Sequence, residues 1–155
     1  MYNRTKAIEY AKKYAFEYNK NFYDFSLIGG DCTNFVSQCL NAGGILMDFS
    51  FDGWFYTDAQ NRSPAWTSVE EFWKYGLKNK NLKLKKVNIE QVEVGDIVQF
   101  FDINQNRYYH CVIITKIIKP ISKQNIFVAS HDNNAFNKSL ALYNVSNFRF
   151  GKIMN

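Results

Sequence analysis

The chain has 155 residues, of which 46% are hydrophobic and 21% are charged, a composition that is typical of a globular protein and argues against a disordered one. Lysine and arginine exceed the acidic residues by 19 to 14, and the resulting net charge of +5 suits an anionic polymer such as a cell-wall surface better than it suits nucleic acid. Three cysteines without a CxxC pair exclude a dense disulfide scaffold and a four-thiolate zinc site. We expect one domain, residues 1–155, with one core.

The first half of the chain is expected to form helices. Apolar and small residues recur at helical spacing over about residues 4–18, which predicts an amphipathic helix. A second helix is expected to begin near Cys32 and to end at Gly43-Gly44. Further along, Ser68 and Glu71 resemble a capping box, and the apolar residues after Ser68 predict a third, short helix.

The segment between the second and third helices, residues 45–66, has no clear period and is expected to be irregular. It contains three large aromatic residues, Trp54, Tyr56 and Trp66, which we expect to be exposed enough to line a binding surface. A basic run follows over residues 78–86, and such a run is most often a solvated face.

The second half of the chain changes to strand-like patterns. Four segments are expected to be strands: residues 97–101, 109–118, 125–130 and about 148–153. Short links between them favour antiparallel pairing. Because the helices come first and the strands follow, the pattern predicts an α+β fold rather than an alternating α/β one.

Cys32 is the strongest candidate for a nucleophile. It lies where a helix is expected to start, directly after Gly29-Gly30-Asp31. The free N–H groups and the partial positive charge of a helix N-terminus favour thiolate over thiol, and the same N–H groups can bind an oxyanion. Cys39 and Cys111 fall among apolar residues and are expected to lie in the core.

A cysteine hydrolase needs a base, and the chain has two histidines, His110 and His131. His110 opens an apolar strand, so its imidazole can reach a rim while the strand anchors it. His131, Asp132 and Asn133 follow a later strand, and each can orient an imidazole by a hydrogen bond. A zinc site built from Cys32, His110, His131 and Asp132 is a further alternative, although the spacing does not require it.

The ordered motifs resemble a known family. The run from Gly30 to Gly44, which contains Asp-Cys-Thr-Asn-Phe-Val-Ser-Gln-Cys-Leu, is followed by Gly95-Asp96 with its strand, by His110 and by Ser130-His131-Asp132-Asn133. Together with the patterns of the first helix and of residues 66–75, this set is similar to the bacterial putative amidase domain, within the papain-like cell-wall peptidase and amidase superfamily.

The resemblance implies a papain-like core in which N-terminal helices pack on a small antiparallel β-sheet. It implies cleavage of amide bonds, in peptidoglycan peptides or at the sugar–peptide link, with Cys32 as nucleophile and His110 as base. It favours His131 as the third catalytic residue, ahead of Asp132, and the register between the two stays open. Tyr23, Asp31 and Trp66 are the expected substrate-binding residues. We expect a monomer that needs no cofactor and no metal and binds no nucleic acid.

Two other functions use the same residues differently. An acyltransferase or deamidase would use the same dyad, with an amine as acceptor in the first case, and a silent cell-wall-binding domain would have lost the chemistry. The N-terminal residues lack an apolar signal region and no stretch is long enough to span a bilayer. Action at the cell wall is therefore expected after secretion, after release by phage lysis, or within a larger exported protein.

Overall fold

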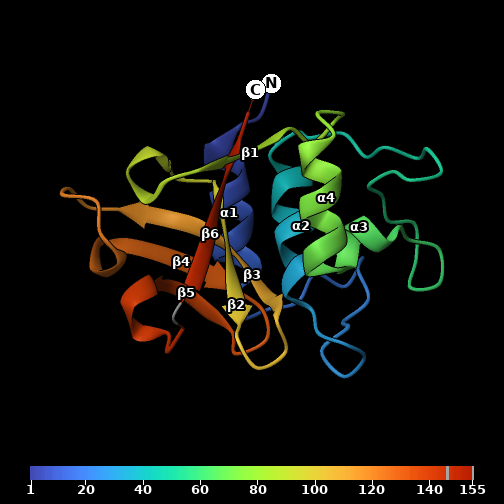
Figure 1. The fold of residues 1–155 in the computed structure, drawn as a ribbon. Helices are drawn as coiled ribbons and strands as arrows, with labels where there is room; N and C mark the ends of the chain where they lie inside the picture. Colours follow the sequence, from blue (N-terminus) through green and yellow to red (C-terminus); the bar gives the residue numbers. More distant parts are fainter. Residues whose placement is uncertain (146, 155) are drawn as a thin grey trace.

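The computed structural model describes residues 1–145 and 147–154 and has an α+β architecture, as predicted (Figure 1). Within this described part, the α-helices come first: α1 (Arg4–Tyr14), α2 (Cys32–Ala42), α3 (Pro64–Thr67) and α4 (Val69–Leu77). Three short 3-10 helices lie later in the chain: η1 (Ile89–Gln91), η2 (Lys123–Asn125) and η3 (Leu140–Leu142).

The strands form one six-stranded sheet in the order β1-β6-β2-β3-β4-β5, and all neighbouring strands are antiparallel. Their bounds are β1 (Leu84–Val87), β2 (Ile97–Asp102), β3 (Arg107–Ile117), β4 (Ile126–Ser130), β5 (Ala135–Ser139) and β6 (Asn147–Ile153). The last strand returns to the middle of the sheet and separates β1 from β2, which brings the two chain ends to one side of the molecule (Figure 1).

Each face of the sheet has its own apolar core, because side chains alternate along every strand. On the helix-covered face, Cys111 and Ile113 of β3 pack with residues of α1, α2 and α4. On the other face, Val112 and Ile114 of β3 pack with neighbours from β2, β4 and η3. The strand β3 therefore lies between two cores, and His110, near its N-terminal end, contacts Phe100 of the second core.

The three aromatic residues of the irregular segment are not exposed, contrary to the sequence-based expectation. Trp54 and Trp66 are completely buried, and Tyr56 is 9% exposed. The two indole N–H groups donate to the polar residues of α2: Trp54 Nε1 to Ser37 Oγ at 3.0 Å, and Trp66 Nε1 to Asn34 Oδ1 at 2.9 Å. These hydrogen bonds attach the segment to α2, and from Pro64 on it forms α3 and is not irregular as expected.

The Gly95-Asp96 pair of the sequence motif holds the N-terminus against the sheet. Gly95 has a φ of +89°, and a Cβ there would lie 3.0 Å from the Tyr2 hydroxyl oxygen. The fully buried Asp96 carboxylate accepts hydrogen bonds from Arg4 at 2.7 Å and from the Ile153 backbone N–H at 2.9 Å. Gly95 and Asp96 therefore have a structural role, since they connect α1, β2 and β6.

Among the helices that the structure describes, none combines the length and the apolar character needed to cross a bilayer.

Candidate active site

Cys32 is the first residue of α2 and is 5% exposed, at the bottom of a cleft of about 240 Å³. The turn before it contains Gly29 and Gly30, both with positive φ, which only glycine adopts without strain. A Cβ on Gly30 would lie 2.7 Å from an oxygen of Asp132, so glycine is also required for space. The sequence motif thus places the thiol at a helix start beside an open cleft.

His110 and Asp132 converge on Cys32 from two other elements. One ligand-type atom of each of the three residues, a sulfur, a ring nitrogen and a carboxylate oxygen, lies within 4.8 Å of the other two. His110 comes from β3 and Asp132 from the turn between β4 and β5. The structure therefore brings together three of the four residues that the sequence assigned to catalysis.

The turn after β4 separates His131 from Asp132. The pairing of β3 with β4 reaches Ile113 opposite Ala129, and residues 131–134 form a turn, not a strand. In this turn the His131 ring contacts Asp31 and the backbone oxygen of Tyr14, whereas the Asp132 carboxylate accepts from the Cys32 N–H. Asp132, and not His131, therefore joins this cluster.

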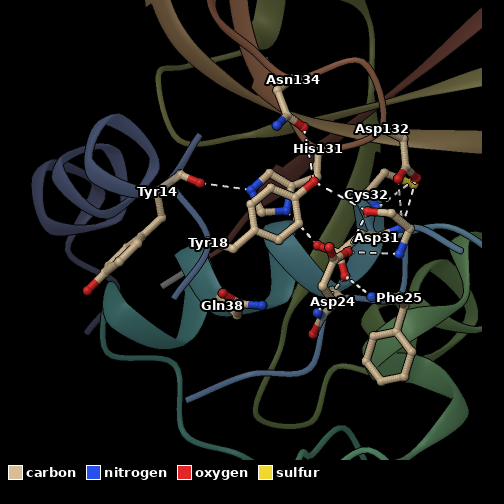
Figure 2. Close-up of polar contacts among 12 residues, drawn as sticks. Tyr14, Tyr18, Asp24, Phe25, Asp31, Cys32, Gln38, His131, Asp132 and Asn134 are labelled. Atoms are coloured by element: carbon tan, nitrogen blue, oxygen red, sulfur yellow. Dashed lines mark hydrogen bonds and ion pairs between the residues drawn. The ribbon is translucent and has the colours of Figure 1, made fainter. Parts of the chain in front are cut away.

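Asp132 caps the helix that carries Cys32 (Figure 2). Its carboxylate accepts hydrogen bonds from the backbone N–H of Asp31, at 2.8 and 3.0 Å, and from that of Cys32, at 3.1 Å. Asp132 and Asn133 both have left-handed backbone conformations, with φ of 59° and 66°, which Asp and Asn tolerate better than most residues. This tight turn directs the carboxylate back toward the start of α2.

His131 is buried and fully engaged elsewhere (Figure 2). Its Nδ1 lies 2.5 Å from a carboxylate oxygen of Asp31, and its Nε2 lies 2.8 Å from the backbone oxygen of Tyr14. Its ring is stacked between those of Tyr18 and Phe35, with centroids 3.9 and 4.1 Å away. The imidazole therefore connects α1, α2 and the Asp31 turn, and both of its nitrogens already have partners.

Asp31 has a similar internal role. It is 1% exposed, and its second carboxylate oxygen accepts from the Phe25 backbone N–H at 2.8 Å and from the Asn34 amide at 2.9 Å. It thereby shapes the loop before Cys32, but it is too buried to meet a substrate directly. The expected substrate-binding role is therefore not supported by its position.

Tyr23 and Trp66, the other expected substrate-binding residues, do not line the cleft. Trp66 is completely buried. Tyr23 is 45% exposed, its backbone oxygen accepts from the Asn34 amide at 2.9 Å, and its ring meets that of Phe25. It supports the loop next to the cleft wall and does not form the wall itself.

The electrostatic environment differs from the expectation of a thiolate. Burial, and next the Asp132 carboxylate, raise the pKa of the Cys32 thiol to about 11. Burial, and next the charge of Lys138, lower the pKa of His110 to about 4. The helix N-terminus was expected to favour the thiolate, but the Cys32 N–H donates to the Asp132 carboxylate, whose negative charge opposes a second anion. The pair is therefore a neutral thiol beside a neutral imidazole at pH 7.

The two other thiols are core residues, as expected. Cys39 and Cys111 are completely buried. Burial raises the pKa of both thiols above the ordinary value. Only Cys32 of the three lines the cleft.

The cleft wall contains residues that the sequence analysis missed. Besides Cys32 and the two glycines it is lined by these residues: Phe25, Ile28, Arg62, Thr67, Ser68, Val69, Glu70, Arg107, Tyr108 and Tyr109. They come from four separate parts of the chain. No spacing connects Arg62, Glu70 and Arg107 in the sequence, and only the packing of α4 beside the start of β3 brings them together.

The cluster is also chemically able to hold a metal. Thiolate, imidazole and carboxylate are all ligands that Zn²⁺ accepts, and three protein ligands with one open position make a zinc site. The set would be Cys32, His110 and Asp132. His131, which the sequence analysis included in the zinc alternative, has both ring nitrogens in hydrogen-bond contact with Asp31 and Tyr14.

Comparison with known proteins gives the family. The model of the Putative amidase domain matches residues 1–153. The uncharacterised protein YjcM of Bacillus subtilis (strain 168) is 32% identical over 142 residues, which are 88% of this chain and 32% of YjcM. The uncharacterised protein YhbB of the same organism is 31% identical over 126 residues, 73% of this chain and 37% of YhbB.

The chain thus spans about a third of the length of these curated relatives. No solved structure matches it significantly. The family model nevertheless covers almost every residue from the first helix to the last strand, so the chain belongs to the Putative amidase domain family.

Proposed function

We propose that the chain is a cysteine-dependent amidase that cleaves amide bonds of bacterial peptidoglycan. The observation that carries this proposal is the convergence of Cys32, His110 and Asp132 within 4.8 Å of one another, with Cys32 lining a cleft. A nucleophile, a base and a carboxylate this close together are the parts that acyl transfer through a covalent intermediate requires. Membership in the amidase family supports the reaction class.

The pKa values define the order of the proton transfers. His110 is neutral at pH 7 and can accept a proton, whereas Cys32 is a thiol, so the proton moves to the imidazole as the sulfur attacks the amide carbonyl. The imidazolium then gives this proton to the leaving amine, the C–N bond breaks and an acyl-enzyme remains. Water, deprotonated by His110, attacks the thioester, the C–S bond breaks, and the released thiolate takes the proton from the imidazolium. Asp132 stabilises the transient imidazolium by its charge.

The backbone N–H of Cys32 is the expected oxyanion donor, and in the free enzyme it donates to Asp132. An incoming carbonyl oxygen must therefore replace this carboxylate oxygen at the N–H group. Asp132 would keep its two contacts to the Asp31 N–H during such a shift. Releasing the Cys32 N–H from a carboxylate would at the same time lower the cost of ionising the thiol.

Peptidoglycan is proposed as the substrate for two reasons. The resemblance to cell-wall amidases implies it, and the net charge of +5 favours association with an anionic wall. We place the enzyme at the cell wall, as a part of a longer exported protein or after release by lysis. The bond would be one within the stem peptide or the sugar–peptide link.

Mass spectrometry of digested peptidoglycan tests the proposal. The purified chain should release fragments with a new amine and a new carboxylate, and Cys32→Ser should release none. Cys111→Ser is a matched control because this buried thiol contacts the Gln99 amide at 3.5 Å, which a hydroxyl can also do. Equal activity of the parent and Cys32→Ser would contradict the proposal.

The same digestion separates hydrolysis from the acyltransferase alternative. Digests with and without an added amine, such as glycinamide, should give the same carboxylate product if water is the acceptor. Products that carry the added amine would instead identify an acyltransferase, with the same Cys32 and His110 chemistry up to the acyl-enzyme.

A further inference from the structure

We propose that the cleft beside Cys32 contains a subsite for a carboxylate of the substrate, with Arg62 and Arg107 as its binding residues. The inference rests on the proposed function where it assumes that an amide substrate is cleaved at Cys32. The preference of the cleft for a negatively charged ligand does not depend on that function. Three charged residues line the cleft: Arg62, Glu70 and Arg107. A charge that is already paired within the protein is not free to bind a ligand, so the partners of each residue decide its role.

The negative charge of Glu70 is already used within the protein. One carboxylate oxygen accepts from the Tyr108 backbone N–H at 2.9 Å, and the other accepts from the guanidinium of Arg149 at 3.1 Å. Arg149 itself is fixed, because it lies over the rings of Trp73 and Tyr108 at 4.1 and 3.6 Å. Glu70 is therefore neutralised and does not offer a site for an amine of the substrate.

Arg62 is held in place by neutral groups only. Its guanidinium lies 4.2 Å above the ring of Phe25, its Nε donates to Thr67 Oγ1 at 3.3 Å, and one terminal nitrogen donates to the backbone oxygen of Ala59. These contacts fix the orientation of the guanidinium without cancelling its charge. A preorganised guanidinium loses little conformational entropy when it binds a carboxylate.

Arg107 also lines the cleft, at the start of β3 and three residues before His110. Its Nε donates to the side-chain oxygen of Gln105 at 2.7 Å, again a neutral partner. Among the described residues, neither Arg62 nor Arg107 lies within 4.0 Å of a carboxylate oxygen.

The cleft therefore carries two uncompensated positive charges. Guanidinium groups bind carboxylates through paired N–H···O bonds, so an acidic group near the scissile amide is the chemistry that fits. A substrate with an ammonium group at this position would be repelled. This narrows the proposed substrate to an amide that carries a free carboxylate close to the bond that is cut.

Alkylation of Cys32 tests the subsite without any turnover. Iodoacetate and iodoacetamide have similar sizes and differ in one negative charge, and in both reactions the sulfur forms a bond to carbon, iodide leaves and the thiol proton goes to the solvent. The ratio of the two rate constants, iodoacetate over iodoacetamide, is measured at one pH by mass spectrometry of the Cys32 peptide. It reports the local charge, because the thiol ionisation is common to both reagents.

We expect this ratio to fall about threefold to tenfold in the double variant that carries both Arg62→Gln and Arg107→Gln. The loss of two positive charges at the rim of a partly hydrated cleft implies a fall of this size. Lys85→Gln is the matched control, since it removes the same charge from an exposed position in β1 and should leave the ratio unchanged. Added salt should lower the ratio in the parent and much less in the double variant.

An unchanged ratio in the double variant would overturn the subsite. If Arg62→Gln disturbs folding through its lost packing on Phe25, the exposed Arg107→Gln decides alone, with a fall of at least about twofold expected. The outcome is independent of the proposed function. If the ratio depends on the two arginines but the protein does not digest peptidoglycan, the subsite stands and the proposed substrate is rejected. If the protein digests peptidoglycan but the ratio does not depend on the arginines, only the subsite is rejected.

Discussion

The carboxylate of Asp132 accepts a hydrogen bond of 3.1 Å from the backbone N–H of Cys32, the residue whose side chain we propose as nucleophile. The same carboxylate lies within 4.8 Å of the His110 ring. This carboxylate therefore has two opposite effects on the proposed reaction. Its negative charge can stabilise a protonated His110, and the same charge opposes the ionisation of Cys32. Substitution of Asp132 separates these two effects.

Asp132→Asn should lower the turnover number by about a hundredfold to ten-thousandfold, as the loss of an orienting carboxylate does in comparable triads. The amide oxygen of an asparagine can still accept from the Asp31 and Cys32 N–H groups, which both donate to one oxygen of Asp132, so the fold should be retained. Because the Asp132 charge raises the pKa of Cys32, the variant should also be alkylated by iodoacetamide faster than the parent at pH 8. Slow turnover with faster alkylation is the expected pattern. Full turnover in Asp132→Asn would show that another residue orients His110.

His131 should matter for stability rather than directly for chemistry. It forms a buried contact with Asp31 and packs between two rings, and removing one partner of a buried pair costs about 3 kcal/mol or more of unfolding free energy. His131→Asn should therefore lower the urea midpoint strongly, whereas Asp132→Asn should change it little. If His131→Asn is as stable as the parent but inactive, the sequence-based choice of His131 as the third catalytic residue is the better one.

The reactivity of Cys32 should rise steeply with pH in the free enzyme. Since burial and Asp132 raise the thiol pKa to about 11, the thiolate fraction, and with it the rate of iodoacetamide alkylation, should increase about tenfold per pH unit from pH 7 to pH 9. Cys39 and Cys111 are completely buried and should be modified much more slowly in the folded protein. A rate that is already constant at pH 7 would mean that the thiolate forms readily, as the sequence alone suggested.

Metal chelation should leave the activity intact, because the proposed reaction needs no ion. EDTA or phenanthroline should not lower peptidoglycan release, while thiol alkylation should abolish it. Activity that is lost on chelation and restored by Zn²⁺ would instead favour the zinc alternative at Cys32, His110 and Asp132.

Much of the fold could be predicted from periodicity. The starts of α2 and α4 and the strands β2, β3, β4 and β6 were expected within a few residues, because their apolar patterns and caps are local signals. Strands β1 and β5 were not expected. They are edge strands, β1 with two exposed lysines, and they form because β6 and β4 offer them a backbone ladder. The first helix ends at Tyr14, earlier than its apolar pattern suggested.

The sequence predicted those site residues that can be recognised one at a time from their type and their neighbours. Cys32 and His110 followed from the scarcity of cysteine and histidine and from their neighbours in sequence. The choice between His131 and Asp132 depends on the left-handed turn after β4 and on contacts with residues about 100 positions earlier, which no local pattern defines. The raised pKa of Cys32 and the arginines of the cleft depend on long-range packing, and neither has a local signal.

The burial of His110 should make the protein less stable in mild acid. Burial and Lys138 lower the pKa of His110 from 6.5 to about 4 in the folded state, so between these two pH values the unfolded chain binds the extra proton. The unfolding free energy therefore falls by about 3 kcal/mol in all, through His110 alone, as the pH decreases from about 6.5 to about 4. Above about pH 6.5 His110 causes no such loss.

Urea unfolding at pH 7.0 and pH 4.5 measures this loss, with His110→Gln as the comparison because it has a similar size and does not titrate. The drop in unfolding free energy between the two pH values should be larger in the parent than in His110→Gln. The difference between the two drops isolates His110 from the carboxylates, which titrate in both proteins. Equal drops would mean that His110 is not buried in its neutral form, and the proposed role of a neutral base at pH 7 would lose its physical support.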